Sequence, residues 1–99
     1  MGVSMSNRER NKMEQAILGG LLVDNRRYYV IEQIITPDHF SFEPHRKLYE
    51  MIVRWIENSR LADPVTLWPD IISTGLFNEC GGPKYMAELL EAVPLNSPS

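Results

Sequence analysis

Apolar residues recur along this chain at helical spacing. The clearest run occupies offsets 0, 3, 4, 7 and 8 from residue 48, which is one face of an α-helix. Its members are Leu48, Met51, Ile52, Trp55 and Ile56. This helix is predicted to begin near Glu43 and Pro44, because proline is tolerated in the first turn of a helix. No segment alternates with period two for long enough to predict a strand.

The first helix is predicted over residues 7–23. Ser6 and Glu9 have the spacing of a capping box, which satisfies backbone N–H groups at a helix start. The stripe behind them comprises Met13, Ala16, Ile17, Gly20 and Leu21, with Glu14, Gln15 and Asp24 off it. Glycine inside a helix costs about 1 kcal/mol relative to alanine. We therefore interpret Gly19 and Gly20 as points where another helix approaches closely; the alternative is that the helix ends there.

A second helix is predicted over residues 26–35, with Asn25 as its cap and Pro37 ending it. Its buried stripe would be Tyr28, Ile31, Ile34 and Ile35. A tight turn is predicted over Pro37–Phe40, held by burial of the Phe40 ring.

Two further helices are predicted near the C-terminus. Thr66 is expected to cap one that runs to residue 74, with Pro69 in its first turn and Gly75 in the left-handed position that closes it. A turn at Gly81–Pro83 precedes the other, whose apolar residues recur up to Val93. Five helices with short connections predict an all-α orthogonal bundle.

The composition favours one domain. A chain of 99 residues, of which 43% are hydrophobic, suffices for one compact core and leaves little volume for a deep cavity. We expect residues 1–6 to be a disordered tail or a vector-derived leader, residues 7–95 the helical head, and residues 96–99 the start of a linker. The single cysteine, Cys80, can form no internal disulfide, so a reducing, cytoplasmic setting is expected. No apolar run is long enough for a membrane span.

The charge balance argues against direct binding of nucleic acid. Ten Lys and Arg against thirteen Asp and Glu give a net charge of −3, opposite in sign to the basic stripe that binds a phosphate backbone. Residues 1–12 carry a net +2 and residues 79–99 a net −2. This polarity is either the ordinary charge of solvated ends or a weak electrostatic aid to docking.

No residue is predicted to be catalytic, cofactor-binding or metal-binding. The glycine pairs lack the lysine and hydroxyl of a phosphate-binding loop, so the chain is not expected to bind ATP. His39 and His45 lie six residues apart with no further ligand at helical spacing, and capping or surface hydrogen bonding is their expected role. No spacing in the sequence requires an acid–base pair of His45 with Glu43 or Asp38, or a nucleophile pair of Cys80 with either histidine.

Five basic residues are candidates for a partner surface. They are Arg26, Arg27, Arg46, Lys47 and Arg54. The alternative is that each belongs to an ordinary solvated face. Arg26 and Arg27 adjoin Tyr28 and Tyr29, and this basic and aromatic cluster supports a second hypothesis, that the chain binds single-stranded DNA. Most of the aromatic residues fall on apolar stripes, however, which predicts that they are core.

Five short segments, taken together in order and spacing, resemble the N-terminal domain of DnaB-family hexameric replicative helicases. They are Glu14–Gly20, Pro37–Phe40, His45–Tyr49, Asp63–Leu67, and Gly81–Gly82 followed by Tyr85, Leu89 and Pro94. Each is a short packing or turn motif, and the series covers roughly residues 11–95. Pro69 departs from the family pattern, as does the basic and aromatic cluster at residues 26–29.

The resemblance implies a helical head with no catalytic residues of its own. In that family the head joins a collar on the helicase ring and helps to dock a DnaG-type primase. The implied partners are therefore other helicase subunits, the primase and a helicase loader. ATP and Mg²⁺ would belong to a downstream motor domain, and a helical hairpin would follow the linker at residues 96–99. A further alternative is a free-standing adaptor or loader-like protein that uses the same head.

Overall fold

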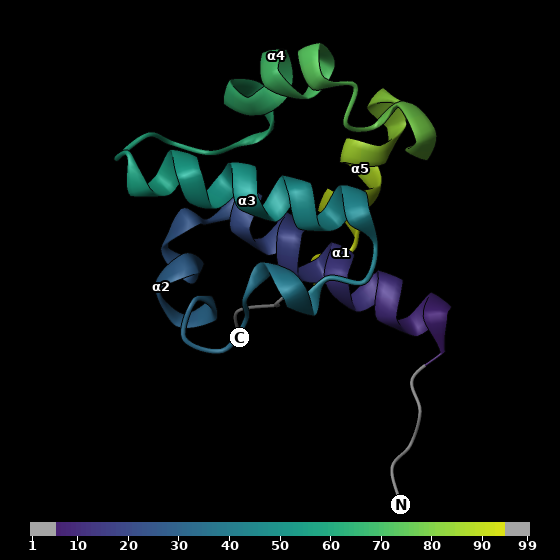
Figure 1. Cartoon of the computed structure of the whole chain (residues 1–99), viewed down its shortest axis with the longest axis horizontal. Helices are drawn as coiled ribbons and strands as arrows, with labels where there is room; N and C mark the ends of the chain where they lie inside the picture. The colour runs from purple at the N-terminus through teal and green to yellow at the C-terminus, as the bar shows by residue number, and fades with distance from the viewer. Residues whose placement is uncertain (1–5, 95–99) are drawn as a thin grey trace, which may run out of the picture.

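A computed structural model of the chain describes residues 6–94, and every regular element among them is helical (Figure 1). The α-helices are α1 (Asn7–Val23), α2 (Tyr28–Ile31), α3 (Glu43–Glu57), α4 (Pro64–Thr74) and α5 (Pro83–Glu91). Three short 3₁₀ turns connect them: η1 (Asn25–Arg27), η2 (Pro37–His39) and η3 (Asn78–Cys80). The predicted all-α bundle of about five helices is confirmed. The predictions for the tail, apart from Ser6, and for residues 96–99 lie outside the described residues.

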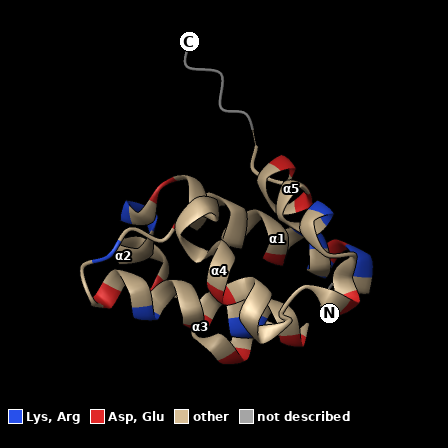
Figure 2. Ribbon diagram, turned by 90° about the horizontal axis from the view of Figure 1, so that it is seen from above, with Lys and Arg blue, Asp and Glu red and all other residues tan. Residues whose placement is uncertain are grey.

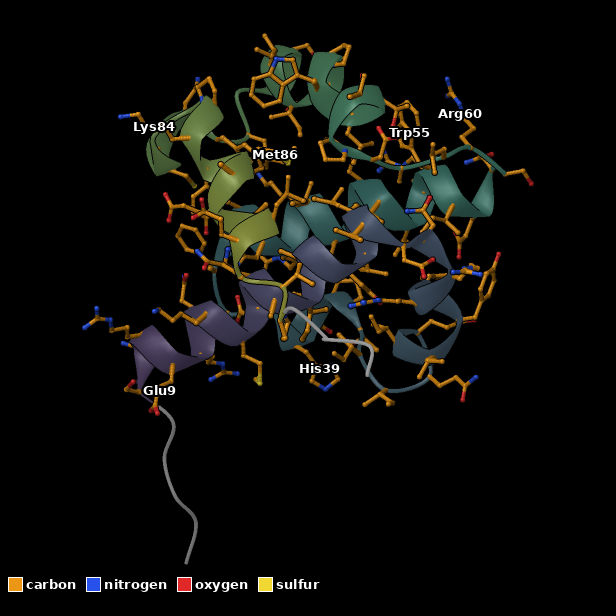
Figure 3. The ribbon with its side chains drawn as sticks, turned by 180° about the vertical axis from the view of Figure 1, so that it is seen from behind. Glu9, His39, Trp55, Arg60, Lys84 and Met86 are labelled. Carbon is orange, nitrogen blue, oxygen red and sulfur yellow. The ribbon has the colours of Figure 1, made fainter. Side chains whose placement is uncertain are left out.

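The C-terminal half of helix α1 lies at the centre of the fold, and the helix packs against both α3 and α5 (Figure 1). The predicted stripe of α3 is confirmed, since Leu48, Ile52 and Ile56 are buried. Its other two members, Met51 and Trp55, are partly buried and pack against the edge of the core. The guanidinium of Arg60 lies over the Trp55 ring, 4.4 Å from the ring centroid (Figure 3). Trp55 therefore lies at the edge of the core, and one face of its ring contacts the Arg60 guanidinium.

The capping box at the start of α1 is confirmed. The Ser6 hydroxyl accepts from the Glu9 N–H at 3.1 Å, and the Glu9 carboxylate accepts from the Ser6 N–H at 3.0 Å. The close approach of another helix is confirmed at Gly19; at Gly20 the neighbour is the Arg27 side chain instead. A β-carbon at Gly19 would overlap the main-chain carbonyl oxygen of Leu89 in α5. The same atom at Gly20 would lie 2.6 Å from a guanidinium nitrogen of Arg27.

The predicted helix over residues 26–35 is wrong in its extent. Only Tyr28–Ile31 is α-helical, and the chain then turns, so Ile34 is 69% exposed rather than buried. Asp24, not Asn25, caps the segment, because its carboxylate accepts from the Arg26 N–H at 3.0 Å.

The Asn25 side chain joins two distant parts of the chain instead. Its amide nitrogen donates to the carbonyl oxygens of Leu21 and Ala62, each at 2.8 Å. Its amide oxygen accepts from the Ala62 N–H, also at 2.8 Å. Asn25 thus ties the end of α1 to the segment that precedes α4.

The predicted start of α4 is also corrected. Asp63 is the cap, because its carboxylate accepts from the N–H groups of Val65 and Thr66 at 2.9 and 2.8 Å. The Thr66 hydroxyl accepts in return from the Asp63 N–H at 2.9 Å, which completes a capping box. Because the helix begins at Pro64, Pro69 lies inside it and not in its first turn. Gly75 has a φ of 67° and closes the helix as predicted.

The remaining predicted turns are present. Phe40 is 2% exposed and follows the turn η2, as expected. Gly81 and Gly82 both have positive φ values, of 105° and 73°, in the turn before α5. Helix α5 ends at Glu91, two residues before the predicted limit of its apolar stripe.

Candidate functional site

The described residues contain a buried polar network that the sequence pattern does not predict. The pattern places Glu14 off the buried stripe and Met13 on it; the structure reverses them, with exposures of 3% and 47%. His45, for which surface hydrogen bonding is the expected role, is fully buried. Its Nδ1 lies 2.8 Å from a carboxylate oxygen of Glu14, and its Nε2 contacts the Tyr85 hydroxyl. The network therefore joins α1, α3 and α5.

Hydrogen bonds around Tyr85 define the protonation of the network. The Gln15 side-chain amide donates to the Tyr85 oxygen at 3.1 Å, so the Tyr85 O–H is free to donate to Nε2 of His45. The single proton of a neutral His45 then lies on Nδ1 and is donated to Glu14. The ring is enclosed on all sides, so this network holds helices together and no substrate reaches it.

The Glu14 carboxylate also caps the loop before α3. It accepts from the N–H and hydroxyl of Ser41 at 2.8 and 2.7 Å and from the Phe42 N–H at 3.4 Å. Burial alone would raise the pKa of Glu14, but the hydrogen bonds from Ser41, His45 and Phe42 lower it below its ordinary value. Burial lowers the pKa of His45, and the hydrogen bond to Glu14 opposes that shift only in part.

These pKa shifts predict that the chain loses stability in mild acid. Both folded-state pKa values lie below the unfolded ones, so the unfolded chain binds more protons. The free energy of unfolding should therefore fall as the pH drops below about 6.5 through His45, and again below about 4.5 through Glu14. Urea denaturation at pH 7.5, 6 and 5 measures the first step.

The other histidine provides the control for this prediction. His39 is exposed, and its Nδ1 accepts from the Thr36 N–H at 2.9 Å in a local cap, as expected (Figure 3). His39→Gln should keep the step between pH 7.5 and 5, whereas His45→Gln should remove it. A flat profile for the unsubstituted chain over this range would show that His45 is not held neutral by the fold.

Arg26 and Arg27, the first two candidate surface residues, lie at the junction of α1 and α2. Arg26 donates from two nitrogens to the two carboxylate oxygens of Asp24, at 2.9 and 3.0 Å. Its side chain is nonetheless 88% exposed. Arg27 lies against Gly20 of α1. One of the pair is thus bound to a neighbouring carboxylate, and the other packs on the fold.

Arg46, Lys47 and Arg54, the other three candidates, lie on α3 in two places. Arg46 and Lys47 are 3.7 and 3.6 Å from the same carboxylate oxygen of Glu43 in the first turn. Arg54 is about two turns further along α3 and lines a groove that α3 forms with α2. The five candidates therefore do not form one patch, and Figure 2 shows the basic positions scattered over the surface.

The structure separates the aromatic residues of the basic cluster. Tyr28 is 6% exposed and its hydroxyl donates to Glu57 at 2.9 Å, whereas Tyr29 is 57% exposed. Only Tyr29 has a ring available for stacking on a base. The geometry therefore gives little support to a single-stranded DNA site over residues 26–29.

Opposite charges of the first and the last α-helix face each other. Lys12 of α1 and the acidic residues Glu88 and Glu91 of α5 line one shallow groove between these helices.

No helix in the described part of the chain is long and apolar enough to cross a membrane. Over residues 6–94, no three His, Cys, Asp or Glu side chains are grouped so as to hold a metal ion.

Together, the fold and its surface define a small all-helical head whose buried polar side chains, within the described range, are all hydrogen bonded. The sequence model of one family, described as DnaB-like helicase N terminal domain, matches residues 6–98. The chain belongs to this family.

Known relatives support the assignment. The chain is 35% identical over 78 residues to the replicative DNA helicase DnaB of Rickettsia typhi, a match that covers 78% of this chain and 16% of the relative. Over 81 residues it is 30% identical to the protein of the same name from Geobacillus stearothermophilus, covering 82% of the chain and 18% of the relative. For the Buchnera aphidicola protein the identity is 28% over 81 residues, covering 82% of the chain and 17% of the relative. The chain thus spans less than a fifth of the length of these curated relatives.

Proposed function

We propose that this chain is the N-terminal head of a replicative DNA helicase and that it acts in the cytoplasm through protein contacts. In this role it helps the helicase subunits to assemble as a ring and docks a primase or a helicase loader. The observation that carries the proposal is the family match over residues 6–98, a range that contains all the described helices, from Asn7 to Glu91. ATP hydrolysis, with its Mg²⁺, would belong to a motor domain elsewhere in the parent protein.

The distribution of polar groups supports a role without catalysis. Glu14 and His45, the two buried polar residues, are hydrogen bonded to each other and so join α1 to α3. The five basic candidates, by contrast, all keep part of their surface exposed to solvent. Side chains at the surface can act on other molecules by contact, and the candidates for that contact remain Arg26, Arg27, Arg46, Lys47 and Arg54.

Titration calorimetry of this chain with the C-terminal domain of a DnaG-type primase tests the proposal. Saturable heat in the micromolar range is expected. Reversing the charge of Arg46 and Lys47 together should weaken binding if the first turn of α3 lies in the contact. The matched control reverses Arg8 and Lys12 on α1. Absence of heat at high micromolar concentration would count against docking, and ATP hydrolysis by the purified chain would contradict the non-catalytic role.

A further inference from the structure

A groove runs beside the C-terminal half of α3, which forms one of its walls. Helix α2 and the segment that follows it form the other wall. The volume of the groove is about 390 Å³, within the range of ligand-binding cavities. Ile35, Pro37 and Val53 form an apolar floor, and each is only partly buried. In Figure 1 the two walls lie side by side at one end of the long axis of the molecule. The floor is therefore open to a partner from outside.

Three carboxylates line this groove. Glu32 comes from the turn after α2, and Glu50 and Glu57 come from one face of α3. All three are exposed, and none forms an ion pair among residues 6–94. Arg54 is the one basic residue in the lining, so the groove carries a net charge of −2.

Two buried tyrosines, Tyr28 and Tyr49, also line the groove, and its carboxylates act on both. Burial, together with the hydrogen bond to Glu57 and the charges of Glu57 and Glu32, raises the pKa of Tyr28 to about 12. Burial and the charge of Glu32 raise the pKa of Tyr49 as well. Burial is the larger cause of both shifts and the carboxylate charges add to it; those charges themselves attract a positively charged occupant.

We propose that this groove docks a basic amphipathic helix of a partner protein. Apolar side chains of that helix would cover Val53 and Ile35, and Lys or Arg side chains along one edge would pair with the three carboxylates. Glu50 and Glu57 are seven residues apart, about 10 Å along α3. Basic residues two turns apart on a helix lying along α3 match that distance.

The charge of the groove distinguishes a protein from a nucleic acid as the occupant. A phosphate backbone would meet three carboxylates and one arginine, which opposes binding. The inference rests on the proposed function, because it names the chemistry of one partner of the head. It adds an acidic contact surface to the five basic candidates, of which only Arg54 lines the groove.

A defined peptide tests the groove directly. The probe is a synthetic amphipathic helix of leucine and lysine, about 15 residues long so that it can fold when bound. A leucine and glutamate peptide of the same pattern is its counterpart. Calorimetry gives the affinities for the 99-residue chain, and ¹H–¹⁵N chemical shifts locate the contact. We expect the lysine peptide to bind, to shift Ile35 and Val53, and to weaken as salt is raised.

Two triple variants with the same change in net charge separate the groove from general attraction. Glu32→Gln, Glu50→Gln and Glu57→Gln together should weaken the lysine peptide by about tenfold. The matched control is Glu79→Gln, Glu88→Gln and Glu91→Gln, outside the groove, which should change the affinity less than about twofold. Unchanged thermal midpoints establish that both variants fold.

Three outcomes would overturn the inference: equal weakening by both triple variants, equal binding of the glutamate peptide, or groove shifts caused by a single-stranded oligonucleotide. If the lysine peptide fails but the primase domain binds with shifts elsewhere, the groove is not the docking site while the proposed function survives. If neither binds, both proposals fail.

Discussion

Replacing Glu14 with alanine is expected to destabilise the chain by about 3 to 5 kcal/mol. The carboxylate is 3% exposed and accepts hydrogen bonds from Ser41, Phe42 and His45. Removing it leaves the buried Nδ1–H of His45 without an acceptor, and alanine leaves a cavity where three elements meet. The free energy of unfolding, measured by urea denaturation at pH 7.5, tests this directly.

Two comparisons show whether the loss comes from the network. Glu14→Gln keeps the shape and one acceptor oxygen, so it should lose less than the alanine variant. Glu50→Ala removes an exposed glutamate from α3 and should change stability by less than about 0.5 kcal/mol. If Glu14→Ala and Glu50→Ala had equal effects, the buried network would contribute nothing to the fold.

Replacing Gly19 with alanine is expected to cost about 2 to 3 kcal/mol, although alanine is the better helix former. The new methyl group would meet the main-chain carbonyl of Leu89 and a methyl of Val93. A backbone atom cannot rotate away as a flexible side chain can, so α5 must move off α1. Thermal unfolding followed by circular dichroism measures the loss.

The adjacent glycine supplies the control for that prediction. At Gly20 the methyl group would meet the end of the Arg27 side chain. Arg27 is exposed and can swing into solvent, and alanine adds about 1 kcal/mol of helix propensity. Gly20→Ala should therefore be neutral or slightly stabilising. Equal losses at both positions would mean that the chain requires glycine for a reason other than the contact with α5.

Local patterns in the sequence predict most of the helices. The stripe of α3 is evident because its apolar residues follow the helical period without interruption, and Gly75 is evident because a left-handed residue favours glycine. The second helix is overestimated because its isoleucines have helical spacing, whereas two local features end the regular helix early. Asp24 begins a 3₁₀ turn at residue 25, and the chain turns again after Ile31.

The buried network and the acidic groove cannot be read from local patterns. Glu14 and His45 are 31 residues apart, and Gln15 and Tyr85 are 70 apart, so only the tertiary fold brings them together. One signal does exist for the network: Glu14 has the same helical phase as Leu18 and Leu21, which points it inward. For the groove, Glu50 and Glu57 share a face of α3, but Glu32, in the turn that follows α2, joins them only because the fold brings that turn to the same groove.

The hydrogen bonds between the Asn25 side chain and the Ala62 main chain have a consequence for hydrogen exchange. The Ala62 N–H lies outside any helix, yet the residue is fully buried and its N–H is bonded to the Asn25 side chain. Its proton can exchange with solvent only when the end of α1 separates from the segment before α4. The exchange rate of this one loop amide therefore measures how often the end of α1 separates from the segment before α4. Helical amides would measure this less clearly, because they also exchange when their own turns open.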